Sequence, residues 1–481
     1  MVVLRQDFTT KPSGWWRRAA HAGVAALALT VMALPRPAAA ETLAQTLADA
    51  YEHSGLLDQN RALLRAADES VAQAVAGLRP IINWSADITR TFGRARVNRV
   101  VVPNADTNFN AGISLDLLLY DFGRTRLQIQ AAKETVLATR ENLRSVEQLV
   151  LLRAVAAYMN VRRNGELVSV RQNNLRLLRE ELRAAQDRFE VGEVTRTDVA
   201  LAEAALASAR AGLAVAQGNL TQAIEEFRAA VGRAPGNLQP PGPLPRLSGD
   251  IDGAKAIAVR KHPDIMRARF EVASAELTVA AAEAATRPTL NFTSRIGTSD
   301  EFGVSDDSRV GSFGLALSGP IYQGGLLSSA VRQAMAQRDA LRGAQHEVRL
   351  QVVQDVGNAY SILLAAQASR QAGLEQVRAA RVAFRGLREE AQLGARTTLD
   401  VLDAEQDLLD AQGTAIEAEA DLYIAAYTVL ETIGELTAKD LRLRVQLYDP
   451  EGYYNLVEDA PVAISPQGQK LDRVLKALGR Q

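Results

Sequence analysis

The sequence contains no cysteine among its 481 residues. That absence excludes disulfide bonds, thiolate metal ligands, a cysteine nucleophile and a lipid-modified N-terminal cysteine. Aromatic residues make up only 5% of the chain, and the four histidines lie far apart without metal-ligand spacing. No nucleophile motif or phosphate-binding loop occurs either. We therefore expect neither an enzyme nor a cofactor or metal site.

The chain also lacks an excess of charge of either sign, since 55 basic residues nearly balance 56 acidic ones. A nucleic-acid partner is therefore not expected. Hydrophobic residues make up 47% of the chain, and alanine dominates long stretches. This composition favours long, closely packed helices over a compact enzyme with a bulky core.

Long hydrophobic runs are missing as well, apart from one near the N-terminus. Basic residues between Arg5 and Arg18 precede an apolar run over residues 22–34, and small residues end at Ala40. This pattern predicts a secretory signal peptide cleaved after Ala40, because the run is too short to span a bilayer comfortably. No later stretch reaches eighteen uninterrupted apolar residues, so a mature membrane protein would have to be a β-barrel.

Two segments of the sequence are nearly alike, Val191–Glu203 and Leu393–Glu405. Each places one glycine between two long helical patterns and follows it with Thr-x-x-Asp, a helix-start signal. The duplication predicts an architecture of two similar halves. The positions shared by the two copies are Gly192 and Gly394, Thr195 and Thr397, Asp198 and Asp400, Val199 and Val401, Ala202 and Ala404, and Glu203 and Glu405.

The same order of elements occurs in both halves. An alanine-rich helix ends at Arg-Pro, where proline forces the chain out of the helix, and two strands and a long helical hairpin follow. The predicted divisions are a signal peptide (1–40), a first repeat (41–234), a proline-rich linker (235–250), a second repeat (251–436) and a partly mobile C-terminal segment (437–481). The β-hairpins are expected at about 81–120 and 289–321, and the helical turns at 192 and 394.

All four strands alternate apolar and polar side chains. Ile82, Trp84 and Ile88 share one face of the first strand, and Leu115, Leu117 and Leu119 continue the apolar face of the second. Such alternation over about ten residues behind a signal peptide is typical of membrane barrel strands, although one such strand alone would also fit a half-buried hairpin. Because lipid excludes open sheet edges and four strands cannot close a barrel, we expect the chain to oligomerise.

With these features the sequence resembles the TolC family of outer-membrane efflux and secretion channel proteins over essentially all of the mature chain. The resemblance lies in the Arg-Pro helix ends, the Tyr-x-x-Gly turns at Tyr120 and Tyr322, and above all the two glycine turns at 188–199 and 393–404. It implies a mostly α fold with a β-barrel part. Three copies would close a twelve-stranded transmembrane barrel in outer-membrane lipid, with four strands from each chain, and their helical hairpins would form a periplasmic tunnel.

The implied function is a gated exit duct of a tripartite efflux or type I secretion system in the bacterial outer membrane. Its implied partners are two further copies of the chain, a periplasmic adaptor (membrane fusion) protein and an inner-membrane pump of RND, ABC or MFS type. The alternative is a soluble periplasmic coiled-coil scaffold or adaptor. Uniform polarity on both faces of the strands would favour that alternative, and the observed alternation does not.

The resemblance also implies roles for individual residues. Where the family has a gate tyrosine this chain has Ala391, which implies a looser closed state. The residues matched to family roles are Thr197, Asp198 and Arg396 at the periplasmic gate, Asp400 and Asp403 in an acidic constriction ring, and Gly192, Thr195, Gly394 and Thr397 in the turns that dock the adaptor.

The two aspartates of the second turn differ in how well helix capping alone explains them. Asp400 and Asp403 lie three residues apart on one helix face, so a threefold axis would crowd six carboxylates together, raise some of their pKa values and create a cation site. The alternative role is helix capping, since both Thr-x-x-Asp segments have capping-box form. Capping explains Asp198 and Asp400, but it does not explain Asp403.

Overall fold

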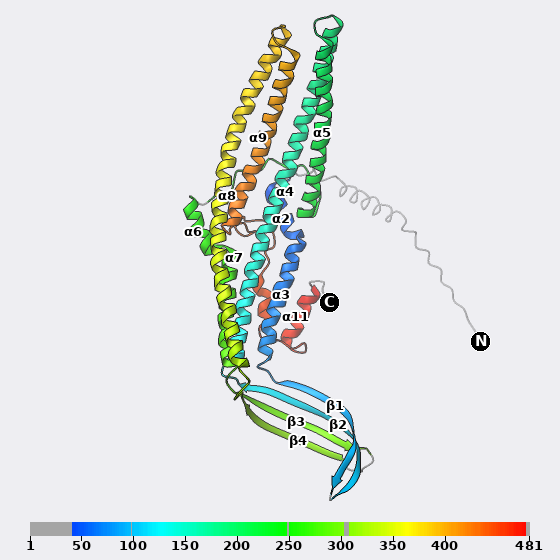
Figure 1. The fold of residues 1–481 in the computed structure, drawn as a ribbon, viewed down its shortest axis with the longest axis vertical. Helices are drawn as coiled ribbons and strands as arrows, with labels where there is room; N and C mark the ends of the chain where they lie inside the picture. The colour runs from blue at the N-terminus through cyan, green and yellow to red at the C-terminus, as the bar shows by residue number, and fades with distance from the viewer. Residues whose placement is uncertain (1–40, 98, 248–249, 303–306, 478–481) are drawn as a thin grey trace, which may run out of the picture.

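The structure is a computed structural model that describes residues 41–97, 99–247, 250–302 and 307–477. The predicted signal peptide lies outside the described residues. The described chain is an elongated bundle of helices with a four-stranded sheet at one end (Figure 1). The mostly α fold with long helical hairpins, a β part and an internal repeat is therefore confirmed.

Both halves contain the same elements in the same order. The first half consists of α2 (Leu43–His53), α3 (Gly55–Ala76), β1 (Ile81–Val97), β2 (Val100–Tyr120), α4 (Arg124–Glu190) and α5 (Arg196–Val231). The second half consists of α6 (Ile251–Lys261), α7 (Pro263–Ala284), β3 (Thr289–Glu301), β4 (Asp307–Ser318), α8 (Leu326–Gln392) and α9 (Thr398–Thr432). The C-terminal segment, whose sequence lacks helical periodicity, contains the short helices α10 (Pro450–Val457) and α11 (Pro466–Ala477).

Each long rod begins at a glycine with left-handed backbone, Gly123 (φ 86°) and Gly325 (φ 85°). This conformation is strained for other residues and explains the glycine of each Tyr-x-x-Gly turn. Asp121 fixes the first turn by accepting hydrogen bonds from the backbone N–H of Gly123 and from the backbone and hydroxyl of Thr125. The rods α4 and α8 each have 67 residues, which at 1.5 Å per residue corresponds to about 100 Å.

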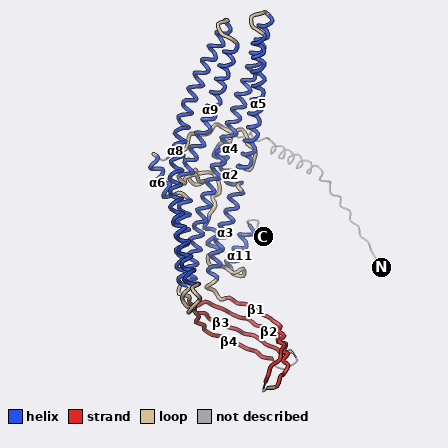
Figure 2. The backbone as a smooth tube through the Cα atoms, in the orientation of Figure 1, coloured by secondary structure: helices blue, strands red, loops and turns tan. Residues whose placement is uncertain are grey.

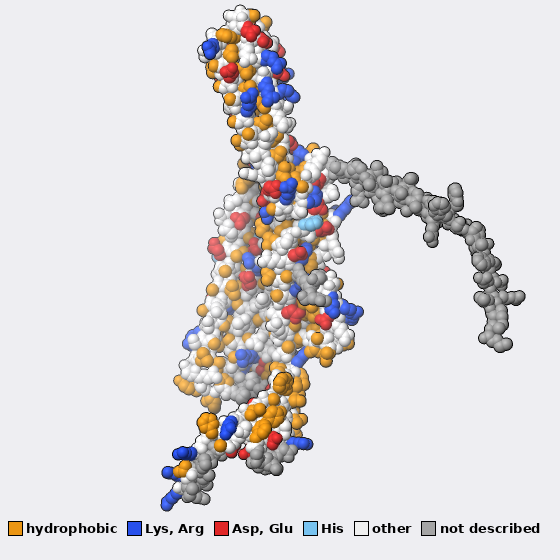
Figure 3. Space-filling view, turned by 90° about the vertical axis from the view of Figure 1, so that its right-hand side faces the viewer, with side chains coloured by type: hydrophobic (Ala, Val, Ile, Leu, Met, Phe, Trp, Pro, Cys, Tyr) orange, Lys and Arg blue, Asp and Glu red, His pale blue; other side chains and the backbone are white. Residues whose placement is uncertain are grey.

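The sheet is antiparallel in the order β1-β2-β3-β4, and the β2–β3 pair joins the two halves. The register places the apolar residues of all four strands on one face, where Ile113 lies opposite both Trp84 and Ile296. The face is open, with Trp84 80% and Phe313 84% exposed. Figure 3 shows hydrophobic side chains gathered over this end of the molecule.

One detail of the predicted alternation is wrong. The register of β2 against β3 shifts between Leu118 and Tyr120, so that Tyr120, not Leu119, lies opposite Leu290 on the apolar face. A bulge adds one residue to one strand and reverses the side-chain alternation beyond it. Because a bulge depends on the partner strand, period-two patterning alone did not predict it.

The main core lies midway along the molecule, where α2, α3 and α4 pack with the ends of α5 and α9. Its largest fully buried side chains include Tyr158, Phe227, Leu151 and Ile433. Toward the hairpin tips only two small apolar clusters remain, one around Leu206 and one around Phe384. The outer parts of the rods are therefore held by few contacts within a single chain.

One described helix, α5, is long and apolar enough by composition to cross a membrane. The sequence predicts no such helix when only uninterrupted apolar runs are counted, because polar residues interrupt α5. The apolar character of α5 comes largely from alanine, and the helix lies along α4 as the returning arm of a hairpin (Figure 2). Alanine allows such close side-by-side packing of two long helices.

Candidate functional site

The candidate site comprises the two hairpin tips, which lie at the end of the molecule farthest from the sheet (Figure 1). The chain turns at Gly192 (φ 81°) and Gly394 (φ 76°). An L-residue would be strained at these φ values, and this explains why both copies of the repeat keep a glycine. No other atom lies close to where a Cβ would be at either position. The turns are therefore open to solvent in the chain.

A capping box starts each returning helix. Thr195 donates its backbone N–H to Asp198 Oδ2 (2.9 Å), and the Asp198 N–H donates to Thr195 Oγ1 (3.3 Å). Thr397 and Asp400 repeat the arrangement at 3.0 and 3.2 Å. These hydrogen bonds hold the pKa of both aspartates below the usual value, through the Thr195 hydroxyl first for Asp198 and the Thr397 backbone first for Asp400. The capping role is thus present for both.

Arg396 is held within its own hairpin. Its Nε donates to Glu390 Oε2 at 2.9 Å, and both side chains are about half exposed. Within the described part of the chain, no hydrogen bond or ion pair joins Arg396 to Thr197 or Asp198. Sequence reasoning missed Glu390, although its place in the last turn before Gly394 was a usable signal. The chain alone thus does not bring together the residues matched to the gate.

Asp403 lies one helical turn beyond Asp400 on α9 and is exposed. No hydrogen bond or ion pair reaches its carboxylate from the residues that the structure describes. Asp403 caps nothing, so the structure gives it no structural role within one chain. The acidic ring expected from the sequence would crowd the carboxylates of Asp400 and Asp403 and raise some of their pKa values only if several copies of the chain surrounded a common axis.

A partly buried polar cluster, which no pattern in the sequence indicates, joins the two hairpins behind the tips. Asn174 Nδ2 on α4 donates to Glu405 Oε1 on α9 at 2.6 Å, and Arg388 Nε on α8 lies 3.0 Å from Glu181 Oε1 on α4. Burial raises the pKa of Glu405 to about 7. The repeat had marked Glu405 only as the counterpart of Glu203, which is exposed.

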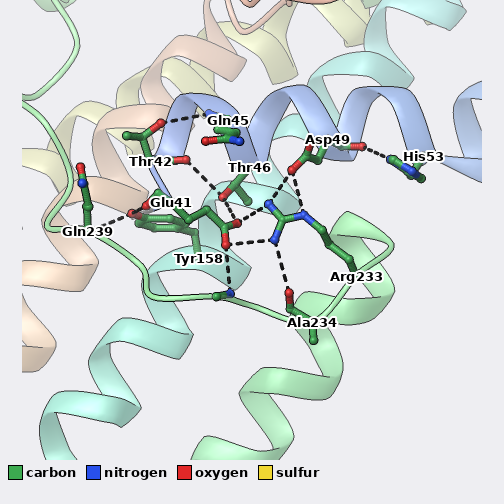
Figure 4. Close-up of polar contacts among 11 residues, drawn as sticks. Glu41, Thr42, Gln45, Thr46, Asp49, His53, Tyr158, Arg233, Ala234 and Gln239 are labelled. Atoms are coloured by element: carbon green, nitrogen blue, oxygen red, sulfur yellow. Dashed lines mark hydrogen bonds and ion pairs between the residues drawn. The ribbon is translucent and has the colours of Figure 1, made fainter. Parts of the chain in front are cut away.

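A second polar network fixes the end of α5 to the start of the described chain (Figure 4). Arg233 donates to both oxygens of Glu41, at 3.0 and 2.7 Å, and through Nε to Asp49 Oδ2 at 2.9 Å. Tyr158 adds hydroxyl hydrogen bonds to the backbone carbonyls of Glu41 and Gln239. Burial alone would raise the pKa of Glu41, but the hydrogen bonds, that from Arg233 first, outweigh it and lower the pKa. The network positions the linker that leads to the second half.

Replacing Arg233 with alanine is expected to lower the free energy of unfolding by about 2 kcal/mol. Breaking a fully buried ion pair costs about 3–5 kcal/mol, and the 37% exposure of Arg233 reduces that figure. Urea unfolding followed by circular dichroism measures the change. The control is Arg228→Ala, which removes an exposed pair with Glu225 on the same helix and should cost less than about 0.5 kcal/mol. Equal losses in both variants would contradict this role for the network.

Across the described ranges, no group of three or more histidine and acidic residues is placed to hold a metal ion. Neither tip contains such a group. The candidate residues at the tips are charged and hydrogen-bonding groups on the ends of long helices. Such groups suit a contact that forms and breaks between neighbouring hairpins.

Comparison with known proteins gives consistent likenesses in sequence and fold. The family model described as "Outer membrane efflux protein" matches residues 46–233 and 257–435, one match in each half. The chain is 37% identical over 424 residues to the outer membrane efflux protein BepC of Brucella suis, covering 88% of this chain and 91% of BepC. It is 26% identical over 426 residues to the outer membrane protein TolC of Escherichia coli, covering 84% of each. The solved structure of the Campylobacter jejuni CmeC outer membrane channel superposes with a TM-score of 0.74 at 17% identity, covering 88% of this chain and 90% of that one.

Proposed function

This chain belongs to the outer membrane efflux protein family, and we propose that three copies of it assemble into one gated channel. The protein is an outer-membrane exit duct of an efflux or secretion system, and it extends into the periplasm. The family is one of transport channels, and its members act with a periplasmic adaptor and an inner-membrane pump. For this chain, the threefold assembly and the two partners are proposals.

The observation that carries the assembly is the open sheet. β1 and β4 are its two edges, and each has one side on which no strand of the described residues pairs with it. Lipid cannot satisfy unpaired backbone groups, so each edge must pair with another copy. The apolar face of the sheet, exposed at Trp84, Phe313 and Leu317, fits lipid. A soluble scaffold, the alternative function, would leave that face in water.

The helical hairpins support the same assembly, because they have exposed apolar side chains such as Val215 on α5 and Ile362 and Leu364 on α8. Neighbouring copies would cover these side chains and form a tunnel. At its end, Arg396 of one copy would meet Thr197 and Asp198 of the next. The open turns at Gly192, Thr195, Gly394 and Thr397 would contact the adaptor.

The experiment is the mass of the protein extracted from outer membranes in detergent, combined with crosslinking from the hairpin tips. We expect a complex of three copies, and crosslinks from residues beside Gly192 and Gly394 to an adaptor protein. Recovery of a single copy from the soluble periplasmic fraction without detergent would contradict the proposal and favour the scaffold.

Asp403→Ala is expected to weaken block of the channel by divalent cations roughly tenfold, which corresponds to about 1.4 kcal/mol of binding free energy. The physical reason is that Asp403, which is exposed and has no partner among the residues that the structure describes, would face a narrow lumen beside Asp400. Conductance in planar bilayers with increasing Mg²⁺ measures the effect. Asp403→Glu keeps the charge and should keep the block. Equal block of Asp403→Ala and the unaltered protein would exclude Asp403 from the constriction.

A further inference from the structure

Two polar contacts link the hairpins of one chain close to their tips. The Asn174–Glu405 hydrogen bond connects α4 to α9, and the Arg388–Glu181 ion pair connects α8 to α4. Each contact therefore ties the first hairpin to the second. Two small apolar clusters also join the hairpins, one through Leu177 and one through Leu402, and the polar contacts add to them.

The packing between the tips is incomplete. A small cavity of about 90 Å³ lies between the rods, lined by Ala391, Arg388, Glu181 and Val401 among others. Ala391 is too short to fill it. Because this part of the interface is not filled by side chains, the neighbouring polar groups contribute more to holding the two hairpins together.

Charge in this cluster is unbalanced. Glu181 on α4 and Glu405 on α9 lie near the guanidinium of Arg388 on α8, which pairs with Glu181. Glu180 and Arg188 on α4 also line the cavity, so three carboxylates stand against two guanidinium groups. Glu405 is only 4% exposed, and its Oε2 has no hydrogen-bond partner among the described residues. Its single donor is the neutral amide of Asn174. Burying an ionised carboxylate with so few donors costs free energy, whereas the same carboxylate exposed to water has no such cost.

We propose that Asn174, Glu181, Arg388 and Glu405 form a proton-sensitive latch that holds the two hairpins of each chain together in the closed channel. Opening would separate α4 from α9 and return Glu405 to water. The proposal rests on the gated-channel function above and adds a contact within each chain to the gate between chains. Asn174 and Glu405 act here as positioning residues, since neither needs to touch the transported molecule.

The direction of the pH effect follows from Glu405. Burial first, and then the charge of Glu181, raise its pKa from 4.5 to about 7, against the opposing effects of Asn174 and Arg388. The closed contact therefore binds a proton more tightly than the open one. Its contribution is fully present below about pH 4.5 and is lost as the pH rises through about 7. Between pH 6 and 8 the closed-to-open ratio should fall roughly tenfold for each latch.

The experiment is single-channel recording of the full-length protein in planar bilayers at pH 6 and pH 8. We expect resting opening to increase at pH 8. Glu405→Gln is neutral at both pH values and keeps an acceptor for Asn174, so it should stay closed at both. Asn174→Ala, which leaves Glu405 without its donor, should increase opening at both. The matched control is Glu203→Gln at the exposed repeat position, which should keep the full pH response.

Three results would overturn the latch: a resting conductance that does not change with pH, a full pH response in Glu405→Gln, or loss of the response in Glu203→Gln. The last would place the titrating group elsewhere. Failure of the proposed function is distinguishable, because the unaltered protein would then form no channel or would be fully open at both pH values. If only the latch is wrong, Arg396→Ser still increases the resting conductance while pH does not.

Discussion

Replacing Leu315 with arginine is expected to abolish assembly of the protein in the outer membrane. Leu315 is 68% exposed on the apolar face of the sheet and lies opposite Phe292. If that face meets lipid, an arginine near the middle of the bilayer costs about 2–4 kcal/mol in each copy. A barrel of three copies would contain three such arginines, and their summed free-energy cost is comparable to the free energy of unfolding of a whole domain.

The control for this prediction is the adjacent residue on the other face. Ala316 lies opposite Asn291 and alternates to the polar side of β4. An arginine at Ala316 would point into an aqueous lumen, so Ala316→Arg should assemble normally. Density-gradient separation of membranes, followed by electrophoresis of unheated samples, measures assembly. If Leu315→Arg assembled as well as Ala316→Arg, the apolar face would not be the lipid-facing one.

Arg396→Ser is expected to raise resting conductance roughly tenfold and to make cells sensitive to large antibiotics. A hydrogen bond to a charged group contributes about 1.5–3 kcal/mol. Loss of one such bond in each copy therefore shifts the equilibrium between the closed and the open gate at least about tenfold. The structure adds a second variant. Glu390 holds Arg396 within its own hairpin at 2.9 Å, so Glu390→Gln frees the guanidinium and should leave the channel closed.

The two variants separate a gate role from a local one. If Arg396 served only to order its own turn through Glu390, both variants would have the same effect. An unchanged leak in Arg396→Ser would mean that other contacts, the Glu405 latch among them, hold the closed state. Asp198 is a poor substitute for this test, because its capping box makes any loss of function ambiguous.

Much of the fold could be predicted because its signals are local. Proline at the helix ends, glycine at the turns and period-two alternation in the strands each depend on a few neighbouring residues. The family, the channel function and the outer-membrane location followed from the duplicated turns, and the comparisons confirm all three. The bulge beside Leu119 was missed because strand register depends on the partner strand.

The candidate site was less accessible to sequence reasoning. Glu203 and Glu405 occupy the same repeat position, yet Glu203 is exposed on α5 and Glu405 is buried against α4. No local pattern distinguishes them, because burial of Glu405 depends on Asn174, far away in the sequence. The Arg388–Glu181 pair is equally distant. The proposed gate and constriction remain predictions, because they require residues of neighbouring copies to meet.

The most direct measurement of the central claim is the single-channel conductance of the purified protein in planar lipid bilayers. A channel of three copies predicts discrete steps of uniform size, a low resting level and block by divalent cations. A folded, purified protein that inserts no conducting steps, and that stays soluble without detergent, would contradict the account of the chain as one part of an outer-membrane channel.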